Sequence, residues 1–430
     1  MVTRREALIG TGAALGGLAI SSAVSRAETE NADAGHVHAT ASAGRNYTPV
    51  VTPNGRTLSF RMVGGVKVFH LIAEEVRHEF APGLKARCWS YNGRVHGPTI
   101  EAVEGDQVRI YVTNRLPAPT SVHWHGLILP AGMDGVSGLT QPPIPPGETF
   151  RYEFTLRQNG TFMYHSHHDA MTQEGMGLTG LFVIHPKYAF TPTVDRDFAI
   201  MLHEWRIDPG TERPNTLEMT DFNVLTMNGK VFPATEPLVV RLGQRVRIRF
   251  ANLSAQDHHP IHLHGFEFFE TAVDGDRIPE SRQIRKVTTL VGVGETRDIE
   301  FVADNPGDWI FHCHMTHHTM NQMGHDFPNM VGVSPGGLER QIAGLLPGYM
   351  TMGETGMGDM MHMPIPKNSI SMRKVDGPFG AKVMLGGMAS VVKVRANIRN
   401  YEAPGWYRHP KGTVASRASS DELRRDGIKT

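Results

Sequence analysis

The sequence predicts an all-β protein made of two repeated domains, each a β-sandwich or Greek-key barrel. Short stretches alternate polar and apolar residues at 107–112, 150–154 and 245–250, as strands with one buried face do. Gly, Pro and Asn residues bound these stretches, as expected for turns. A set of short motifs also occurs twice along the chain. This pattern favours antiparallel sheets over βαβ units.

The repeat defines two homologous domains, which we place at 46–190 and 191–335. The motifs of the first domain are Asn92-Gly93, Gly105, Asn114, His123-Trp-His-Gly126, Gly147-Glu-Thr and Tyr164-His-Ser-His167. Their counterparts in the second are Asn228-Gly229, Gly243, Asn252, His262-Leu-His-Gly265, Gly294-Glu-Thr and Phe311-His-Cys-His314.

Residues 1–27 indicate a twin-arginine export signal, because Arg4 and Arg5 precede a short apolar stretch that ends in small residues near Ala27. The alternative is a short membrane anchor, but glycines break the apolar run and it is short for a bilayer span. We therefore expect a periplasmic or secreted protein without stable membrane insertion.

Residues 336–430 do not repeat the domain pattern, and we expect a C-terminal extension that packs on the sandwiches. A short helix is predicted at 338–346, and stretches such as 390–394 look extended. Segment 350–363 is rich in Met. Thioethers select Cu(I), so this segment is either a Cu(I) site or a flexible loop without metal.

The charges balance, because Lys+Arg and Asp+Glu both number 43, which argues against a nucleic-acid partner. His and Met are abundant, at 23 and 22 residues, whereas Cys88 and Cys313 are the 2 cysteines. They could pair as a disulfide. Cys313 lies between two histidines and is better suited to be a metal ligand, and Cys88 is expected to be a buried small hydrophobe.

Residues 312–323, HCHMTHHTMNQM, hold the most informative run of candidate ligands. Cys313, His318 and Met323 supply the thiolate, imidazole and weak axial thioether of a blue-copper site. Because side chains alternate along a strand, Cys313 points to one face while His312 and His314 point to the other. One strand could therefore contact two metal centres.

Histidine pairs spaced i, i+2 occur at matched positions of the repeats, and on strands the members of a pair point to the same side. The pairs are His123/His125, His165/His167, His262/His264 and His312/His314. Such pairs predict a cluster of several copper ions. Ser166 stands where the second domain has Cys313, so only the second domain can hold the blue-copper site, and His259 supplies its second imidazole.

These four histidine motifs resemble those of the multicopper oxidases, and the resemblance covers about residues 46–335. It implies cupredoxin-like domains and four copper ions per functional unit. By this resemblance, His259, Cys313, His318 and Met323 would bind type 1 copper. His123 and His262 would bind type 2 copper. The type 3 pair would be held by His125, His165, His167, His264, His312 and His314.

The resemblance also implies a laccase-like oxidase. A reducing substrate, such as a phenol, an aromatic amine, Cu(I) or another metal ion, would give single electrons to the type 1 copper. Cys313 would pass them through His312 and His314 to the cluster, where O2 becomes water. Asp134 resembles the acid that relays protons, although an Asp-Gly turn explains it equally well. Small two-domain laccases imply a homotrimer whose clusters lie between neighbouring chains.

Two other functions remain as alternatives. A copper nitrite reductase would carry the type 1 cysteine in the first domain and would lack the type 3 histidines. A periplasmic copper-resistance or copper-sequestering protein would use the Met-rich segment 350–363. Three further histidines, His168, His258 and His317, adjoin the motifs and are expected to be neighbouring or surface residues rather than ligands.

Overall fold

The computed structural model describes residues 47–208, 210–218, 220, 222–319, 341, 344–345, 375–383 and 385–429. They belong to one compact unit, Asn46–Thr430. The predicted signal at 1–27, the ligand Met323 and the Met-rich segment 350–363 lie outside the described residues. None of the helices in the described part of the chain is long and apolar enough to cross a bilayer.

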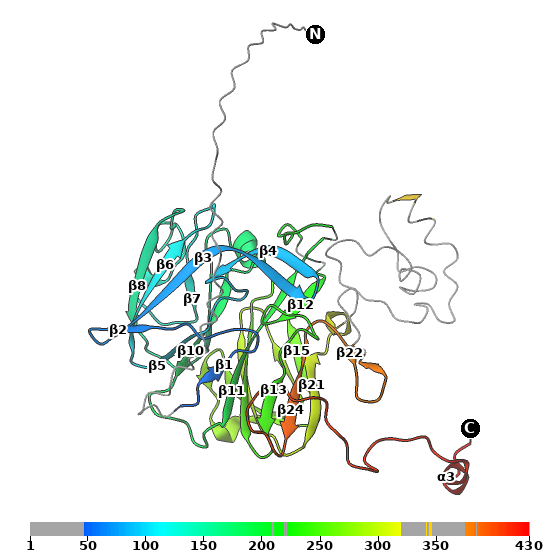
Figure 1. Ribbon diagram of the computed structural model, residues 1–430. Helices are drawn as coiled ribbons and strands as arrows, with labels where there is room; N and C mark the ends of the chain where they lie inside the picture. Colours follow the sequence, from blue (N-terminus) through cyan, green and yellow to red (C-terminus); the bar gives the residue numbers. More distant parts are fainter. Residues whose placement is uncertain are drawn as a thin grey trace, which may run out of the picture. The chain divides into compact units, whose positions relative to one another are not determined.

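Two facing sheets form the first domain (Figure 1). Its strands are β2 (Arg61–Val63), β3 (Val66–Ala81), β4 (Leu84–Tyr91), β5 (Ile100–Val103), β6 (Gln107–Asn114), β7 (His123–His125), β8 (Thr149–Thr155), β9 (Gly160–His165) and β10 (Thr179–His185). One sheet has the order β2-β3-β6-β8 with β4 paired to β3, and the other has the order β5-β10-β9-β7. Phe69 of β3 and Trp124 of β7 belong to one buried apolar cluster, so the core lies between the sheets.

The second domain repeats this plan. Its strands are β11 (Arg196–Trp205), β12 (Val224–Met227), β13 (Leu238–Arg241), β14 (Arg245–Asn252), β15 (His259–Leu263), β16 (Phe268–Val273), β17 (Asp276–Arg277), β18 (Ile284–Lys286), β19 (Thr288–Val291), β20 (Thr296–Val302), β21 (Gly307–Cys313) and β24 (Ala389–Arg395). One sheet runs β1-β11-β14-β20-β16-β17, where β1 is Val50–Val51. In addition, β12 pairs with β11 and β18 pairs with β16. The other runs β13-β24-β21-β15-β19.

Few helices occur in the described part of the chain. Those with defined bounds are η1 (Ala131–Met133), α1 (Ala170–Gly175), η2 (Glu280–Arg282), η3 (Thr316–Thr319) and α3 (Ser420–Arg425), and residues 341 and 344–345 are also helical. A small hairpin joins β22 (Val375–Asp376) to β23 (Lys382–Val383). The all-β prediction with two sandwich domains is therefore confirmed. The sheets are mixed rather than purely antiparallel, because β3 pairs with β6 and β11 pairs with β14 in parallel.

The repeated asparagines explain part of the shared architecture. Asn114 is buried at the end of β6, where its amide donates to the carbonyls of Ala118 and Ile144 at 2.9 and 2.8 Å. Asn252 at the end of β14 donates in the same way to Asp257 and Val291 at 2.9 and 3.1 Å. Each asparagine thus ties down the loop that leads to the next histidine strand.

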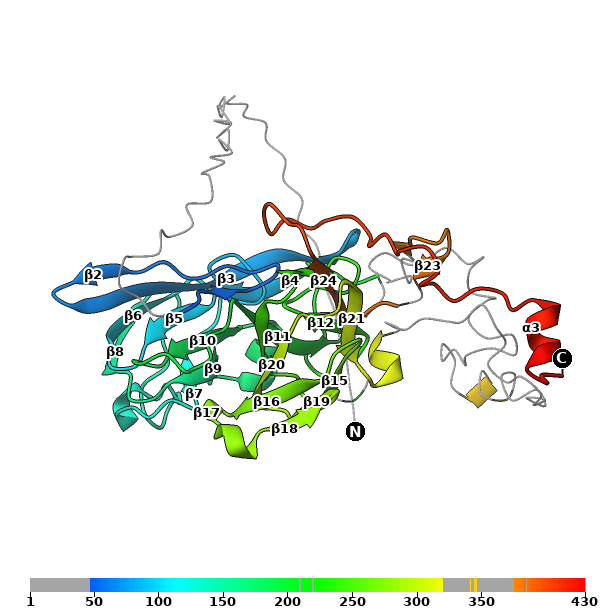
Figure 2. The ribbon, with the colours of Figure 1, turned by 90° about the horizontal axis from the view of Figure 1, so that it is seen from below.

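Strand β24 completes the second domain. It pairs antiparallel with β21 and parallel with β13, just as β10 pairs with β9 and β5 in the first domain. Figure 1 and Figure 2 both show β24 beside β21. Residues 389–395 therefore form an inner strand of this sheet, whereas the sequence predicts an extension packed on the outside. The long segment between β21 and β24 separates this strand from the rest of its repeat.

A buried network of charges joins the two domains. Arg249 on β14 donates to both carboxylate oxygens of Asp197 at 2.7 and 2.8 Å and to Asp298 at 3.0 Å. It also donates to the hydroxyl of Thr161 at 2.8 Å, and that hydroxyl donates to Asp298 at 2.7 Å. Thr161 lies on β9 of the first domain. Arg249 is only 3% exposed, so these contacts are shielded from water.

The same sheet holds a second buried carboxylate, Glu300 on β20. Arg247 donates to its Oε1 atom at 2.7 Å, and Arg277 donates to the same oxygen at 2.8 Å. Burial disfavours the charged form of Glu300, but the positive charges of Arg247 and Arg277 outweigh burial and lower its pKa from 4.5 to about 2. The ionised carboxylate is therefore favoured in the folded state.

We expect Glu300→Gln to destabilise the fold in a pH-dependent manner. The pKa of Glu300 is lower in the folded state, so its contribution to the free energy of unfolding is present above pH 4.5 and is lost as pH falls towards 2. The difference from wild type should be on the order of 3 kcal/mol at pH 6 and should shrink below pH 4. Urea unfolding of the copper-free proteins measures it.

The matched control is Glu267→Gln, because Glu267 pairs with Arg285 on the surface, where both side chains are 62% exposed. This control should change the free energy of unfolding by less than about 1 kcal/mol. A Glu300→Gln effect that is the same at pH 6 and pH 3 would contradict the assignment.

Candidate metal centres

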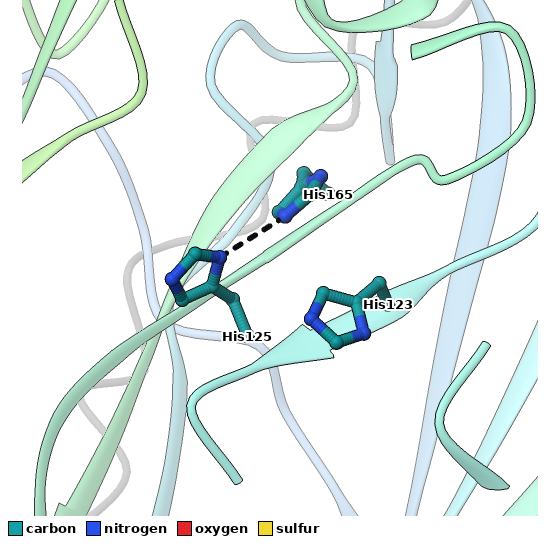
Figure 3. A group of neighbouring side chains, drawn as sticks. All are labelled: His123, His125 and His165. Carbon is teal, nitrogen blue, oxygen red and sulfur yellow. Dashed lines mark hydrogen bonds between the residues drawn. The ribbon is translucent and has the colours of Figure 1, made fainter. Parts of the chain in front are cut away.

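Four histidines of the first domain form one imidazole group. The register places His123 of β7 opposite His165 of β9, and His125 lies on the same face of β7 as His123 (Figure 3). Nδ1 of His125 is 3.3 Å from Nε2 of His165. One ring nitrogen from each of these three residues lies within 4.8 Å of the other two. The ring of His167 is centred 5.5 Å from that of His123 and completes the group.

Outer partners fix the orientation of these rings. Nδ1 of His123 donates to the carbonyl oxygen of Asp134 at 2.8 Å, and the Asp134 carboxylate is 3.4 Å away. Nδ1 of His165 is 3.0 Å from both the Ser166 carbonyl and the carboxylate of Glu174, a residue of α1. Both rings therefore leave Nε2 free to bind a metal ion.

The pKa values of two rings in this group move in opposite directions. Burial and the neighbouring imidazoles lower the pKa of His125 to about 4. Burial also acts to lower the pKa of His165, but the carboxylate of Glu174 outweighs it, so this pKa is raised. Glu174 thus makes His165 more basic, which strengthens an imidazole as a ligand.

A second imidazole group lies on β15 and β21, with His264 and His314 just beyond the strand ends. Nε2 of His264 is 3.2 Å from Nε2 of His312, and the ring of His262 is centred 5.6 Å from that of His314. Nδ1 of His262 donates to the Val287 carbonyl at 2.7 Å, which again leaves Nε2 free.

The opposite face of the same two strands, together with η3, carries a third group. Sγ of Cys313 is 3.4 Å from Nδ1 of His318 and 3.7 Å from Nδ1 of His259, and these two nitrogens are 3.3 Å apart. All three side chains are at most 1% exposed. The predicted alternation is therefore present, because β21 presents Cys313 to the core and His312 to the other face.

Hydrogen bonds at Nε2 fix the orientation of the His259 and His318 rings. Nε2 of His259 hydrogen-bonds to the Ser254 hydroxyl at 2.6 Å, and Nε2 of His318 donates to the Asp257 carboxylate at 3.0 Å. The amide of Met388, just before β24, donates to the carbonyl of His318 at 3.0 Å. Each ring therefore turns Nδ1 towards Cys313.

The residues of this third group fit a copper ion. Burial lowers the pKa of His259 to about 2 and that of His318 to about 4, so both imidazoles are neutral and can donate a lone pair. Burial also raises the pKa of the Cys313 thiol to about 12, so a thiolate here requires a bound cation. Two imidazole nitrogens and a sulfur within 3.7 Å of one another match a blue-copper ligand set.

The first domain has no such ligand set at the equivalent place. Thr120 and Ser166 occupy the positions of His259 and Cys313, and Gln173 lies beside them. The hydroxyl of Thr120 donates to the Gln173 side-chain oxygen at 2.7 Å, and that of Ser166 donates at 2.6 Å. Hydrogen bonds thus replace the metal ligands, as the Ser166 comparison predicts.

The two imidazole groups stay separate within one chain. Every ring contact of the described histidines in the first group is to another member of that group, and the same holds for the second group. Each group alone offers half of the predicted cluster. Gly294 of the second domain lies next to the His125 ring, because a Cβ atom at position 294 would be 3.7 Å from Cε1 of that ring.

The neighbouring histidines have distinct surroundings. His168 hydrogen-bonds to the Ser137 hydroxyl at 2.9 Å, and His258 accepts the Val293 amide at 2.9 Å. His317 lies with Asp257 and His318 in a further potential ligand group. Sequence patterns did not reveal Asp257 or Glu174, because neither residue belongs to a repeated motif. Cys88 is buried and unpaired, as predicted.

The chain matches the models of a known protein family. Two family models, both described as multicopper oxidase, match residues 73–189 and 208–332. The crystal structure of a blue copper oxidase from Nitrosomonas europaea superposes with a TM-score of 0.58 and 26% identity. That match covers 84% of this chain and 94% of the other.

Curated relatives include copper resistance protein A of Escherichia coli, which is 28% identical over 332 residues, or 65% of this chain and 52% of the relative. Laccase-1 of Cryptococcus neoformans var. grubii is 31% identical over 234 residues, or 46% of this chain and 37% of the relative. The chain therefore spans about half the length of the first of these relatives, and less of the second.

We expect Glu174→Gln to weaken metal binding by the first imidazole group. The amide removes the negative charge that raises the pKa of His165, so the affinity of this group for copper should fall by about 10-fold to 100-fold. Copper retained during titration with a chelator measures the change. The control is Glu148→Gln at an exposed carboxylate, which should bind copper as wild type does. Equal copper retention by Glu174→Gln would contradict this role.

Proposed function

This chain belongs to the multicopper oxidase family, and we propose that it is a laccase-like copper-dependent oxidoreductase with O2 as the electron acceptor. The observation that carries the proposal is the division of ligands on β21, where Cys313 faces a buried His-Cys-His group and His312 faces an imidazole group. One strand thus links the two kinds of centre that this chemistry requires.

We assign type 1 copper to His259, Cys313 and His318, with Met323 as the weak axial ligand. We assign type 2 copper to His123 and His262. The type 3 pair is assigned to His125, His165, His167, His264, His312 and His314. This set would hold four copper ions per functional unit. When bound, copper supplies one-electron transfer and the reduction of O2 to water.

The protein provides a short path between the two kinds of centre. Nδ1 of His312 donates to the carbonyl oxygen of Cys313 at 2.8 Å, so a hydrogen bond as well as the covalent chain connects the sulfur to this ring. Cys313 and His259 are 0% exposed, which excludes water from the donors. The protein thereby keeps the thiolate from side reactions and fixes both ends of the path.

We propose that Asp134 delivers protons to the cluster. Its main-chain carbonyl orients His123, and its carboxylate lies 3.4 Å from the same ring. The side chain is 31% exposed, so it can exchange protons with water. One residue thus both orients a ligand and reaches solvent.

We further propose that the chain acts as a homotrimer in which the first imidazole group of one chain meets the second group of its neighbour. The groups make no ring contact with each other within one chain, and exposed apolar residues lie near both along the sequence. Ile128 and Met171 follow His125 and His167 by three and four residues and are 54% and 48% exposed. Val287, whose carbonyl accepts a hydrogen bond from His262, is 47% exposed, and Leu290 is 53% exposed. Burying them between chains would stabilise the assembly.

A copper-resistance role is the second candidate, because copper resistance protein A of Escherichia coli is a relative of this chain. It is compatible with an oxidase that acts on Cu(I) in the periplasm, and the twin-arginine pattern at 1–27 supports export. A nitrite reductase fits less well, since the first domain has Ser166 where that enzyme would carry its type 1 cysteine.

We expect Cys313→Ser to abolish both the blue absorption band and O2 uptake with a phenolic donor, because serine cannot supply the thiolate. The matched control is Cys88→Ala at the other buried cysteine, which should keep the band and the uptake. Visible spectra and an oxygen electrode provide the two measurements. No O2 uptake by the fully copper-loaded wild type would sink the oxidase proposal.

Complementation tests the shared cluster. His125→Ala disables the first imidazole group and His264→Ala disables the second, so each variant alone should be inactive. Co-expressed chains should recover part of the wild-type activity, because some interfaces then join two intact groups. Copper-loaded mixed oligomers without any O2 uptake would show that the cluster forms within one chain. Light scattering of the wild type should report a trimer.

A further inference from the structure

A groove of about 680 Å³ lies on the outer face of the first domain. The chain before β2 forms one wall of this groove, and side chains of β3, β6 and β8 form its floor (Figure 1). We propose that the groove binds acidic saccharides, that is, short chains of uronic acid residues. This binding site is separate from the copper chemistry proposed above and does not depend on it.

The groove and the first imidazole group lie on opposite faces of the first domain. Phe69 of β3 and Trp124 of β7 belong to the core between the two sheets. Because neighbouring residues of a strand point to opposite faces, His70 points out of one sheet and His123 points out of the other. A ligand in the groove therefore leaves the first imidazole group uncovered.

The floor of the groove carries a line of hydrogen-bonding side chains across three strands. Nε2 of His70 on β3 is 2.7 Å from the hydroxyl of Thr113 on β6, and that hydroxyl is 2.8 Å from the hydroxyl of Thr149 on β8. His70 and Thr149 are exposed, and Nδ1 of His70 has no hydrogen-bond partner among the described residues. Hydroxyl groups both donate and accept hydrogen bonds. The two ends of this line can thus bind a ligand that is rich in hydroxyl groups.

Two aromatic side chains add apolar surface to the same groove. Phe60, just before β2, and Tyr111 on β6 both line it and are half-buried. The Phe60 ring packs on the buried ring of Phe69 with the centroids 5.5 Å apart, which holds it in place. Tyr111 lies on the same face of β6 as Thr113, beside the polar line. The groove therefore offers aromatic surface and hydrogen-bonding groups together, as binding sites for small molecules do.

The charges at the groove favour an anionic ligand. Arg61 lies exposed in its wall and makes no ion pair with a described residue. None of the described residues that line the groove is Asp or Glu. Elsewhere on the outer face of β6 and β8, Arg109 and Glu153 pair with each other at 2.7 Å. The guanidinium group of Arg61 can therefore bind a carboxylate of the ligand through two parallel N–H bonds.

A uronic acid residue matches all three features of the groove. Its ring has apolar C–H groups for the aromatic side chains, hydroxyl groups for the polar line and one carboxylate for Arg61. A neutral sugar has no anionic partner for Arg61, and an aromatic carboxylic acid has no hydroxyl groups for the polar line. The volume lies within the roughly 300–1,000 Å³ of typical ligand sites, so more than one sugar residue can enter the groove.

The test is calorimetric titration of the copper-loaded full-length protein with a galacturonic acid trisaccharide. We expect wild type to bind it and Arg61→Gln to bind it about tenfold more weakly, because a charge-assisted hydrogen bond is lost. Thr149→Val removes one end of the polar line at an exposed position and should weaken binding by about threefold to tenfold. The matched control is Arg151→Gln, which changes an exposed arginine on the same face of β8 outside the groove and should bind like wild type.

Two further probes, the neutral trisaccharide maltotriose and benzoate, test the class of ligand. Both should bind wild type more weakly than the acidic trisaccharide does. No binding of the acidic trisaccharide, or equal affinity in wild type and Arg61→Gln, would overturn the proposal. Tighter binding of maltotriose or of benzoate would overturn it as well, in favour of a neutral sugar or an aromatic acid. The readout is binding alone, so the result is independent of whether the protein consumes O2.

Discussion

The buried charge network around Arg249 is the constraint on which the rest of the structure depends. Its guanidinium group bonds Asp197 and Asp298 of the second domain and Thr161 of the first. Thr161 lies on β9, four residues before His165, so the network fixes the strand that ends in a metal-ligand candidate. Buried ion pairs add little stability over apolar packing, but each charged group must keep its partners at hydrogen-bond distance. The network therefore sets the relation between the two domains, and so between their imidazole groups.

The alternation of side chains along β15 and β21 then decides which metal-ligand candidates lie together. On β15 and β21, His259 and Cys313 point into the core, while His262 and His312 point to the other face. Burial follows the same division, because the core side keeps a thiol and two neutral imidazoles dry. The backbone of β21 thus lies between the two kinds of centre, because neighbouring residues of one strand point to opposite faces.

Much of this was predictable from the sequence, since residue type and spacing carry it. The repeat, the alternating strands and the histidine pairs are local patterns. Three features were not predictable. The sequence indicates an extended stretch at 390–394, but its pairing with β21 joins segments that lie far apart along the chain. Parallel pairing of β3 with β6 depends on topology rather than on local pattern. Asp257 and Glu174 act only through folded contacts with His318 and His165, and no periodicity marks them.

The place of β24 also bears on the order of events during synthesis. Gly307 on β21 pairs with Val394, so 86 residues of chain lie between the two partners (394 − 307 − 1), and closing that loop costs entropy before any contact forms. Until residues 388–395 have emerged, β21 lacks one neighbour, and the main chain of Cys313 and His318 lacks the bonds to Met388. In the first domain the corresponding strand, β10, follows β9 after a short connection, so its pairing needs no such long closure. The sulfur-containing pocket is therefore the part of the protein that must wait longest for its sequence to be synthesised.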